Sequence, residues 1–112
     1  MYNIILASQS RVRKSILEKN GISCIVEKSN LDEEPIKESL LKEGASPEII
    51  SKNLAEIKAN KISQKKNDKL VLGADSVIDL NGKIISKPKN RDDALKILRE
   101  LNGKTHHLIS SV

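Results

Sequence analysis

The chain has 112 residues, of which 38% are hydrophobic and 31% are charged. This length suits a single domain, and no apolar run approaches the ~20 residues that a transmembrane helix requires. Tyr2 is the only aromatic residue in the sequence, which excludes nucleic-acid recognition by rows of stacked aromatic side chains.

Charge and cysteine content narrow the partners and the environment. Twenty basic and fifteen acidic residues give a formal net charge of +5, which favours anionic partners such as nucleotides, phosphate esters, nucleic acids or an acidic membrane surface. The single cysteine, Cys24, cannot form an internal disulfide, and the N-terminus lacks the pattern of a secretory signal. We therefore expect a cytoplasmic protein without a membrane partner.

The first elements predicted are a strand, a helix and a second strand. The apolar run at residues 3–7 predicts a strand that leads into a polar loop at residues 8–10. A helix should follow, and Asn20-Gly21 supplies a left-handed conformation that ends it. Residues 22–26 predict the second strand. The apolar positions of the helix fall at helical spacing: Val12, Ile16 and Leu17.

Two further helices are predicted in the middle of the chain. A polar, acidic loop at residues 27–35 precedes a short helix at residues 36–43, which Gly44 ends. The Ser-Pro-Glu sequence at residues 46–48 supplies an N-cap, a proline at the first helical position and an acidic side chain in the first turn. The helix that begins there extends to about Ser63.

The remainder predicts a strand, a hairpin, a helix and a last strand. Residues 69–74 form a compact apolar strand, and Asn81-Gly82 is a strong hairpin signal between strands at residues 77–80 and 83–85. Asn90 caps a helix that Asn102-Gly103 ends, and residues 105–112 begin another strand. The inward positions of this helix are predicted to be Ala94, Ile97, Leu98 and Leu101. The alternation indicates an α/β domain with a mixed sheet and flanking helices.

Hydroxyl and cationic side chains gather between the first strand and the helix that follows it. Ser8 and Ser10 precede Arg13 and Lys14 there. Free amides at a helix N-terminus attract anions, and these side chains can donate hydrogen bonds to phosphate oxygens. The segment is a candidate phosphate site, although no glycines surround it as they would in a Walker-type loop. The alternative is that Ser10 only caps the helix and that the cations are solvated.

Two acidic segments are candidates for metal binding or proton transfer. Mg²⁺ is usually held by one or two protein carboxylates together with substrate phosphates, and residues 32–34, Asp-Glu-Glu, could supply one of them. Asp75 follows an apolar strand, where ligand clefts of α/β sheets lie, and can bind a metal or accept a proton from water. The alternatives are a solvated acidic loop and an Asp75 that orders its own turn.

Two lysines could neutralise phosphate. Lys87 precedes Pro88, which restricts the backbone of Lys87 to extended conformations and aims its side chain consistently. Lys58 follows Ile57 on the long helix and borders its apolar face. The alternative for both is an exposed surface lysine.

Together, these segments resemble the Maf family in their order and spacing, from about residue 4 to the end of the sequence. The motifs that carry the resemblance are Leu6-Ala7-Ser8-Gln9-Ser10, Asp32-Glu33, Leu54-Ala55 with Lys58-Ala59, Leu72-Gly73-Ala74-Asp75, Lys87-Pro88 and Leu101-Asn102-Gly103-Lys104-Thr105-His106.

The resemblance implies an elongated α/β fold similar to that of inosine triphosphate pyrophosphatases. It also implies hydrolysis of a canonical or modified nucleoside triphosphate to its monophosphate and pyrophosphate. Glu33 and Asp75 would position Mg²⁺ or Mn²⁺ and a water molecule, with Asp75 as the proton acceptor. The residues that would contact the substrate are Ser8, Ser10, Arg13, Lys14, Lys58, Ser76 and Lys87.

The sequence departs from the family pattern in two ways. Arg11 and Val12 replace the proline and the first arginine of the family's Ser-x-Ser-Pro-Arg-Arg. That arginine, and a threonine at the position of Ser76, are linked with base selection in the subgroup that prefers dTTP and UTP. The nucleobase is therefore left open, and the form is closer to the Maf-like branch of alphaproteobacteria. Family members are also much longer, so residues 1–112 would be one incomplete Maf-like domain that lacks its C-terminal half.

Other function classes stay open at this point. The first is a non-catalytic nucleotide-binding or cell-division regulatory protein, because the family is also associated with arrest of septum formation. The second, a nucleic-acid-binding module, depends only on the net charge of +5, and we expect no stable nucleic-acid complex. The sequence also leaves open whether the chain forms a homodimer.

Overall fold

Strands and helices are interspersed along the chain in the computed structural model, which describes residues 4–112. The strands are β1 (Ile4–Ala7), β2 (Cys24–Val26), β3 (Leu70–Gly73), β4 (Asp75–Leu80), β5 (Lys83–Ile85) and β6 (His107–Ser111). The helices are α1 (Arg11–Lys19), α2 (Glu33–Lys42), α3 (Pro47–Ser63) and α4 (Arg91–Leu101). The predicted α/β class is thus confirmed, whereas Asn3, where the first strand was expected to begin, lies outside the described residues.

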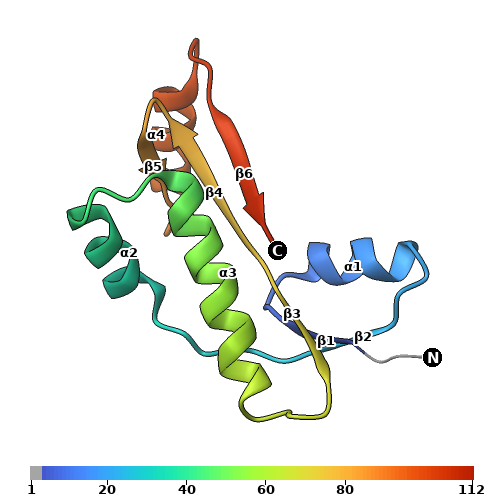
Figure 1. Cartoon of the computed structure of the whole chain (residues 1–112). Helices are drawn as coiled ribbons and strands as arrows, with labels where there is room; N and C mark the ends of the chain where they lie inside the picture. The colour runs from blue at the N-terminus through green and yellow to red at the C-terminus, as the bar shows by residue number, and fades with distance from the viewer. Residues whose placement is uncertain (1–3) are drawn as a thin grey trace.

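The strands form one parallel and one antiparallel sheet. The parallel sheet has the order β2-β1-β3, and the antiparallel sheet has the order β5-β4-β6. Ala74 alone separates β3 from β4, so the two strands follow one another beside α3 and connect the sheets (Figure 1). Since both strand directions occur, the expected mixed α/β architecture is confirmed. The molecule is elongated, with principal extents of 46 × 32 × 22 Å.

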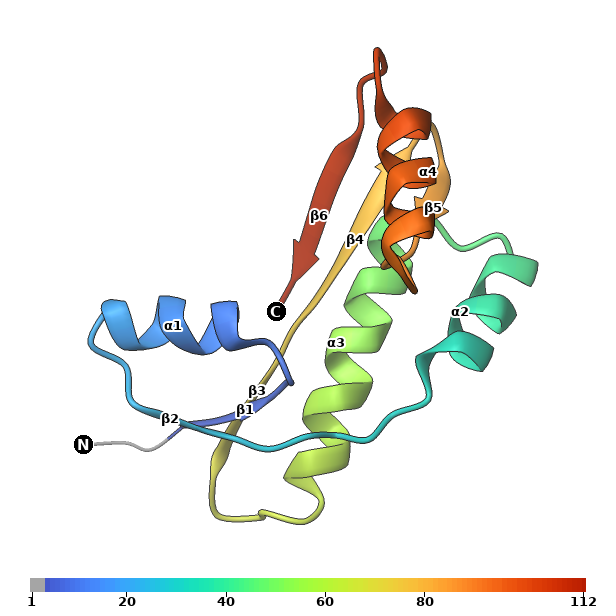
Figure 2. The same ribbon diagram turned by 180° about the vertical axis from the view of Figure 1, so that it is seen from behind.

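Helix α3 packs against both sheets and supplies much of the core. Ser46 accepts a hydrogen bond from the backbone amide of Ile49, and Pro47 occupies the first turn, as predicted. Ile50, Leu54 and Ile62 are at most 1% exposed, and burial of each such side chain stabilises the fold by about 1.5–3 kcal/mol. Figures 1 and 2 show α3 running beside β3 and β4.

The closest approach of strand and helix is at Gly73. A Cβ atom built on Gly73 would lie 2.8 Å from both the Cβ and the backbone N of Ala59, and it would also collide with the carbonyl oxygen of Ala55. Only glycine allows β3 to approach α3 this closely. The position of the next residues, Ala74 and Asp75, depends on this contact.

Several element boundaries differ from the predictions by one to three residues, and two of them lie at the site. Helix α2 begins at Glu33, within the stretch predicted as a loop. Acidic side chains in a first turn interact favourably with the helix dipole, and Pro35 lies where backbone amides need no partner within the helix. Strand β4 begins at Asp75, two residues earlier than predicted, because it pairs with β6 from Asp75 onward.

Helix α4 lies at the periphery of the described structure, and its predicted inward face is only partly correct. Leu98 was expected to point inward but is 64% exposed, and none of the α4 residues is buried. A hydrogen-bonded ion pair of 2.6 Å between Lys83 and Glu100 connects the helix to β5. The amphipathic pattern correctly predicted the helix, but it did not show that other elements bury so little of the helix surface. Within residues 4–112, no helix has both the length and the hydrophobicity that a bilayer span requires.

Candidate functional site

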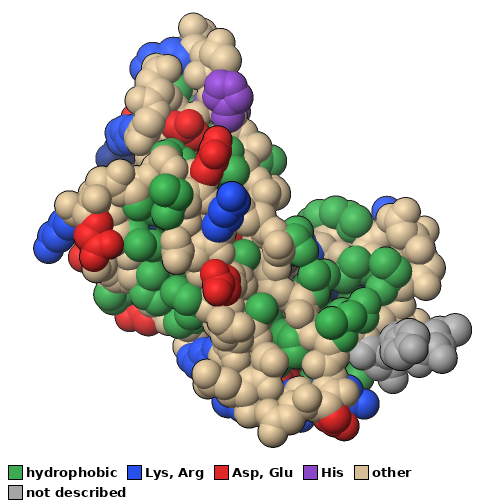
Figure 3. Space-filling view, viewed as in Figure 1, with side chains coloured by type: hydrophobic (Ala, Val, Ile, Leu, Met, Phe, Trp, Pro, Cys, Tyr) green, Lys and Arg blue, Asp and Glu red, His purple; other side chains and the backbone are tan. Residues whose placement is uncertain are grey.

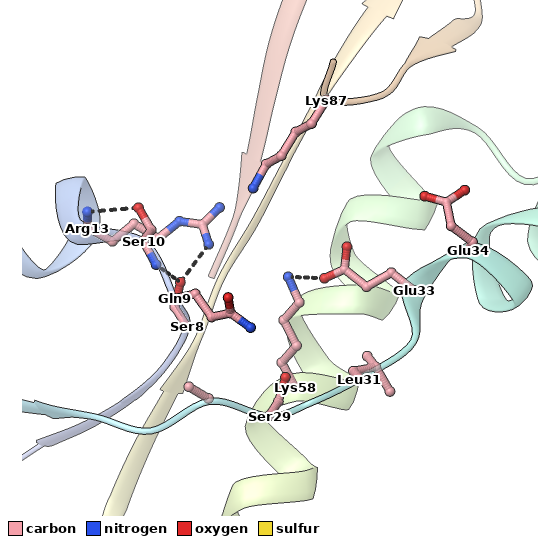
Figure 4. A pocket seen from close by; sticks show the side chains of 11 residues that line it. Ser8, Gln9, Ser10, Arg13, Ser29, Leu31, Glu33, Glu34, Lys58 and Lys87 are labelled. Atoms are coloured by element: carbon pink, nitrogen blue, oxygen red, sulfur yellow. Dashed lines mark hydrogen bonds and ion pairs between the residues drawn. The ribbon is translucent and has the colours of Figure 1, made fainter. Parts of the chain in front are cut away.

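A cavity of about 580 Å³ lies at the carboxyl ends of the parallel strands, where ligand sites of α/β sheets form. Its walls come from the β1–α1 loop, the β2–α2 segment, α3 and the residues after β5 (Figure 4). Segments distant in sequence thus meet around one space. The lining residues are Ala7, Ser8, Gln9, Ser10, Arg13, Ser29, Leu31, Glu33, Glu34, Lys58 and Lys87.

The serine loop and Arg13 form one side of the cavity. Ser8 Oγ accepts hydrogen bonds of 3.1 Å from the backbone amide of Ser10 and from Arg13 Nη1. Ser10 Oγ caps α1 by accepting from the amide of Arg13 at 3.2 Å. Ser10 therefore performs the capping role that was one alternative, and it lines the cavity as well. The loop is held by its own hydrogen bonds before any ligand binds.

The guanidinium of Arg13 connects this loop to the start of β4. It donates to the carbonyl oxygen of Ala74 at 3.1 Å and to Ser76 Oγ at 3.3 Å, in addition to Ser8. A guanidinium has five N–H donors, so these contacts leave two for a ligand. Among residues 4–112, Arg13 makes no ion pair with a carboxylate, which leaves its charge uncompensated beside the cavity.

On the opposite side of the cavity, Lys58 lies between two carboxylates. Its Nζ is 2.6 Å from Glu33 Oε1 and 3.1 Å from Asp75 Oδ1. It also donates to the carbonyl oxygen of Ala74 at 3.4 Å. We call this arrangement the Glu33–Lys58–Asp75 bridge. It brings together the two carboxylates that were predicted to hold a metal.

Asp75 is the most enclosed acidic residue of the site. The residue is 5% exposed, and its Oδ2 accepts no hydrogen bond from the described residues. Its carbonyl oxygen is hydrogen-bonded to Ser51 Oγ at 3.2 Å, and Ser51 Oγ lies 2.8 Å from Ser111 Oγ. An unpaired buried carboxylate oxygen is costly in a folded protein unless a ligand or proton uses it. The alternative that Asp75 only orders its own turn does not account for these contacts.

The remaining predicted lysines lie in different places. Lys87 lines the cavity, and Figure 4 shows its side chain directed toward the space between Arg13 and Lys58. Within the described residues it makes no ion pair. Lys14 lies outside the cavity, on the outer surface of α1, where its Nζ is 3.7 Å from Glu18 Oε1. The structure therefore does not bring Lys14 to the other candidates.

Ser76 lies beside a second, more apolar cavity of about 520 Å³ between α1 and β6. Ser76 Oγ is 2.8 Å from Ser110 Oγ, and Val12 and Leu108 also line this space. Val12 and Leu108 are each 68% exposed, and Figure 3 shows hydrophobic side chains gathered over the region of α1. Ser10, Arg13 and Lys87 line both cavities, so the two spaces adjoin at these residues, and Asp75 lines the second cavity.

Several site residues were missed from the sequence. Ser29 and Leu31 also line the first cavity, and Ser51 Oγ donates a hydrogen bond to the carbonyl oxygen of Asp75. Ser51 is completely buried. The sequence did contain an indication of its role. Ser51 precedes Lys58 by two helical turns on α3, and its hydroxyl interrupts an otherwise apolar stripe of the helix.

The donor atoms around Lys58 suit a hard divalent cation. Glu33, Asp75 and the Ala74 carbonyl supply only oxygen atoms, the ligand type that Mg²⁺ and Mn²⁺ prefer. In residues 4–112, no group of three or more histidine, cysteine or acidic residues forms a complete protein cage. Since Mg²⁺ is commonly held by one or two carboxylates plus phosphates, the residues present fit such an ion.

Fold and site together define an α/β domain whose cavity, at the carboxyl ends of the parallel strands, is lined by both cationic side chains and carboxylates. The family model described as Maf-like protein matches residues 3–112, and the chain belongs to this family.

Similar proteins agree with this assignment. A nucleoside triphosphate pyrophosphatase of Pelagibacter ubique (strain HTCC1062) is 70% identical over 109 residues, which cover 97% of this chain and 56% of the relative. A protein of the same name from Ruegeria sp. (strain TM1040) is 43% identical over 97% of the chain and 55% of the relative. A 7-methyl-GTP pyrophosphatase of Brucella abortus biovar 1 (strain 9-941) is 35% identical over the same shares. The chain thus spans about half the length of the curated relatives it matches.

Proposed function

We propose that the chain contributes the phosphate- and metal-handling part of a nucleoside triphosphate pyrophosphatase. The observation that carries the proposal is the division of the cavity into two sides. Arg13 and Lys87, which have no carboxylate partner among the described residues, lie across a cavity of about 580 Å³ from Glu33, and Lys58 connects Glu33 to the buried Asp75. A metal–triphosphate complex has the matching charges, because its phosphates are anionic and its metal is cationic.

The proposed reaction is attack of water on the α-phosphorus. The bond from this phosphorus to the oxygen that bridges to the β-phosphate breaks, and a monophosphate and pyrophosphate result. Asp75 accepts the proton of the attacking water, and its buried Oδ2 has no hydrogen-bond partner among the described residues. A divalent cation held by Glu33 and Asp75 would neutralise negative charge on the phosphate oxygens.

The cationic residues stabilise the charge that develops on pyrophosphate as it leaves. The two free donors of the Arg13 guanidinium and the ammonium of Lys87 donate to phosphate oxygens. Ser8 and Ser10 keep the loop and Arg13 in position. Because these groups are oriented before the substrate binds, little reorganisation is needed during the reaction.

The base of the substrate would extend into the second cavity, beside Val12 and Ser76. This space adjoins the phosphate side at Arg13 and Lys87, which line both cavities. Its apolar walls suit a planar ring, and one of the similar proteins bears a name that specifies 7-methyl-GTP. Pyrophosphate release should therefore be compared across canonical and modified nucleoside triphosphates.

The test is an assay of pyrophosphate release with Mg²⁺ or Mn²⁺. Asp75→Asn should lower the rate by about 10²–10⁴-fold, the usual contribution of a general base. Asp68→Asn makes the same chemical change in an exposed turn outside the cavity and should retain full activity. An active wild type whose rate Asp75→Asn does not lower would refute the mechanism. Calorimetry that detects nucleotide binding without turnover would instead favour the non-catalytic nucleotide-binding protein.

A further inference from the structure

Lys58 cannot contact a phosphate in the arrangement that the structure describes. An ammonium group has three N–H donors and no acceptor. The Nζ of Lys58 already has three oxygen neighbours, namely Glu33 Oε1 at 2.6 Å, Asp75 Oδ1 at 3.1 Å and the Ala74 carbonyl oxygen at 3.4 Å. A role of Lys58 toward phosphate therefore requires that it first leaves this position.

The same oxygen atoms are those that a divalent cation would use. Two carboxylates and a carbonyl converge on one point, and that point is occupied by the ammonium of Lys58. Two cations cannot share the point, because their mutual repulsion in a buried setting is strong and each oxygen can face only one of them closely. The Lys58 side chain is 11% exposed and that of Asp75 is 7% exposed, so water screens this repulsion little.

We propose that the ammonium of Lys58 and the divalent cation compete for Glu33 and Asp75, and that metal binding releases Lys58 toward the phosphates. The proposal builds on the metal site of the proposed function. In the metal-free protein, Lys58 neutralises the two carboxylates and keeps them together. When a metal–nucleotide complex binds, the cation takes the carboxylates and the displaced ammonium pairs with phosphate, so no charge is left without a partner.

This exchange predicts that metal and nucleotide bind cooperatively. The metal alone must displace an ammonium that then has no phosphate to contact, so it binds weakly. With a triphosphate present, the displaced ammonium has a new partner, and the affinity for the metal rises. By linkage, the metal raises the affinity for the nucleotide by the same factor.

The experiment measures Mn²⁺ affinity of the 112-residue chain by the electron paramagnetic resonance signal of free Mn²⁺. Lys58→Met removes the competing ammonium at similar side-chain length and should bind Mn²⁺ alone about ten-fold tighter than wild type or more, within the usual range of such couplings. Lys58→Arg keeps the charge and should bind no tighter than wild type. Addition of a non-hydrolysable α,β-methylene triphosphate should tighten Mn²⁺ binding in wild type and much less in Lys58→Met.

Lys37→Met is the matched control. Lys37 Nζ lies 3.9 Å from Glu33 Oε2, so this variant removes one positive charge beside the same carboxylate without clearing the space between Glu33 and Asp75. If Lys37→Met tightens Mn²⁺ binding as much as Lys58→Met does, general charge accounts for the effect and the competition is refuted. Circular dichroism verifies that each variant is folded. Lys58→Arg keeps the positive charge, so tighter Mn²⁺ binding by this variant than by wild type would refute the competition even where Lys58→Met is unstable.

Two negative results have different meanings. If wild type and Lys58→Met bind Mn²⁺ with equal affinity, the competition is wrong and the proposed metal site stands. If neither protein binds Mn²⁺ with or without the triphosphate analogue, the metal site of the proposed function fails, and the competition fails with it.

Discussion

Replacement of Gly73 by alanine tests whether the packing of β3 on α3 leaves room for even one methyl group. The new Cβ would lie 2.8 Å from two atoms of Ala59, whereas carbon atoms in contact are normally about 3.5–4.0 Å apart. The strand or the helix must therefore shift by up to about 1 Å. Overpacking of this kind costs about 1–3 kcal/mol, and we expect the upper part of that range because two of the three nearest atoms belong to the backbone of α3.

Urea unfolding followed by circular dichroism measures this cost, because it compares the free energies of unfolding of variant and wild type. Gly103→Ala is the control, since a Cβ there meets open space and only the positive φ of 72° is penalised. Gly73→Ala should also weaken nucleotide binding, because the shift displaces Asp75 two residues further on. A loss of stability below about 0.5 kcal/mol, the level of an ordinary surface change, would refute the argument from close packing.

Three other substitutions test the framework of the site. Ser51→Ala removes the buried hydroxyl that is hydrogen-bonded to the Asp75 carbonyl oxygen and to Ser111 Oγ. The free energy of unfolding should therefore fall by about 1–3 kcal/mol, and an unchanged urea midpoint would contradict this. Arg13→Lys keeps the charge but loses the planar guanidinium that donates to Ser8, Ala74 and Ser76. Calorimetry should therefore show at least about ten-fold weaker nucleotide binding, and equal affinity would contradict this role of the guanidinium. Ser10→Ala removes the cap of α1 and should lower stability by about 1 kcal/mol in thermal unfolding, a loss that Ser10→Asp should restore.

Local structure was predictable where a residue type and a backbone position require each other. Ser46 and Asn90 cap α3 and α4, as predicted, because their side chains satisfy amides that the helix leaves unpaired. Asn81 and Gly82 have φ values of 51° and 89° and form the predicted hairpin turn. The start of α2 was missed because an acidic, proline-containing segment is compatible with both a loop and a first helical turn.

The sequence also identified candidate site residues, but it did not show which of them contact one another. Arg13 and Lys14 are adjacent on α1, yet the direction of each side chain around the helix places one in the cavity and the other beside Glu18. Similarly, the sequence indicated a lysine bordering the apolar face of α3, without showing that it lies between Glu33 and Asp75. Such pairings depend on which faces of the elements pack together.

The sequence by itself determined the elements, the family resemblance and the types of charged group available, because these follow from short-range patterns and motif spacing. The tertiary structure decided that Arg13 and Lys87 line the cavity without a carboxylate partner among residues 4–112, and that Lys58 occupies the point where Glu33 and Asp75 converge. The physical reason is the contact of β3 with α3 at Gly73, together with the pairing of β1 and β3. These long-range contacts set distances between side chains that no local pattern encodes.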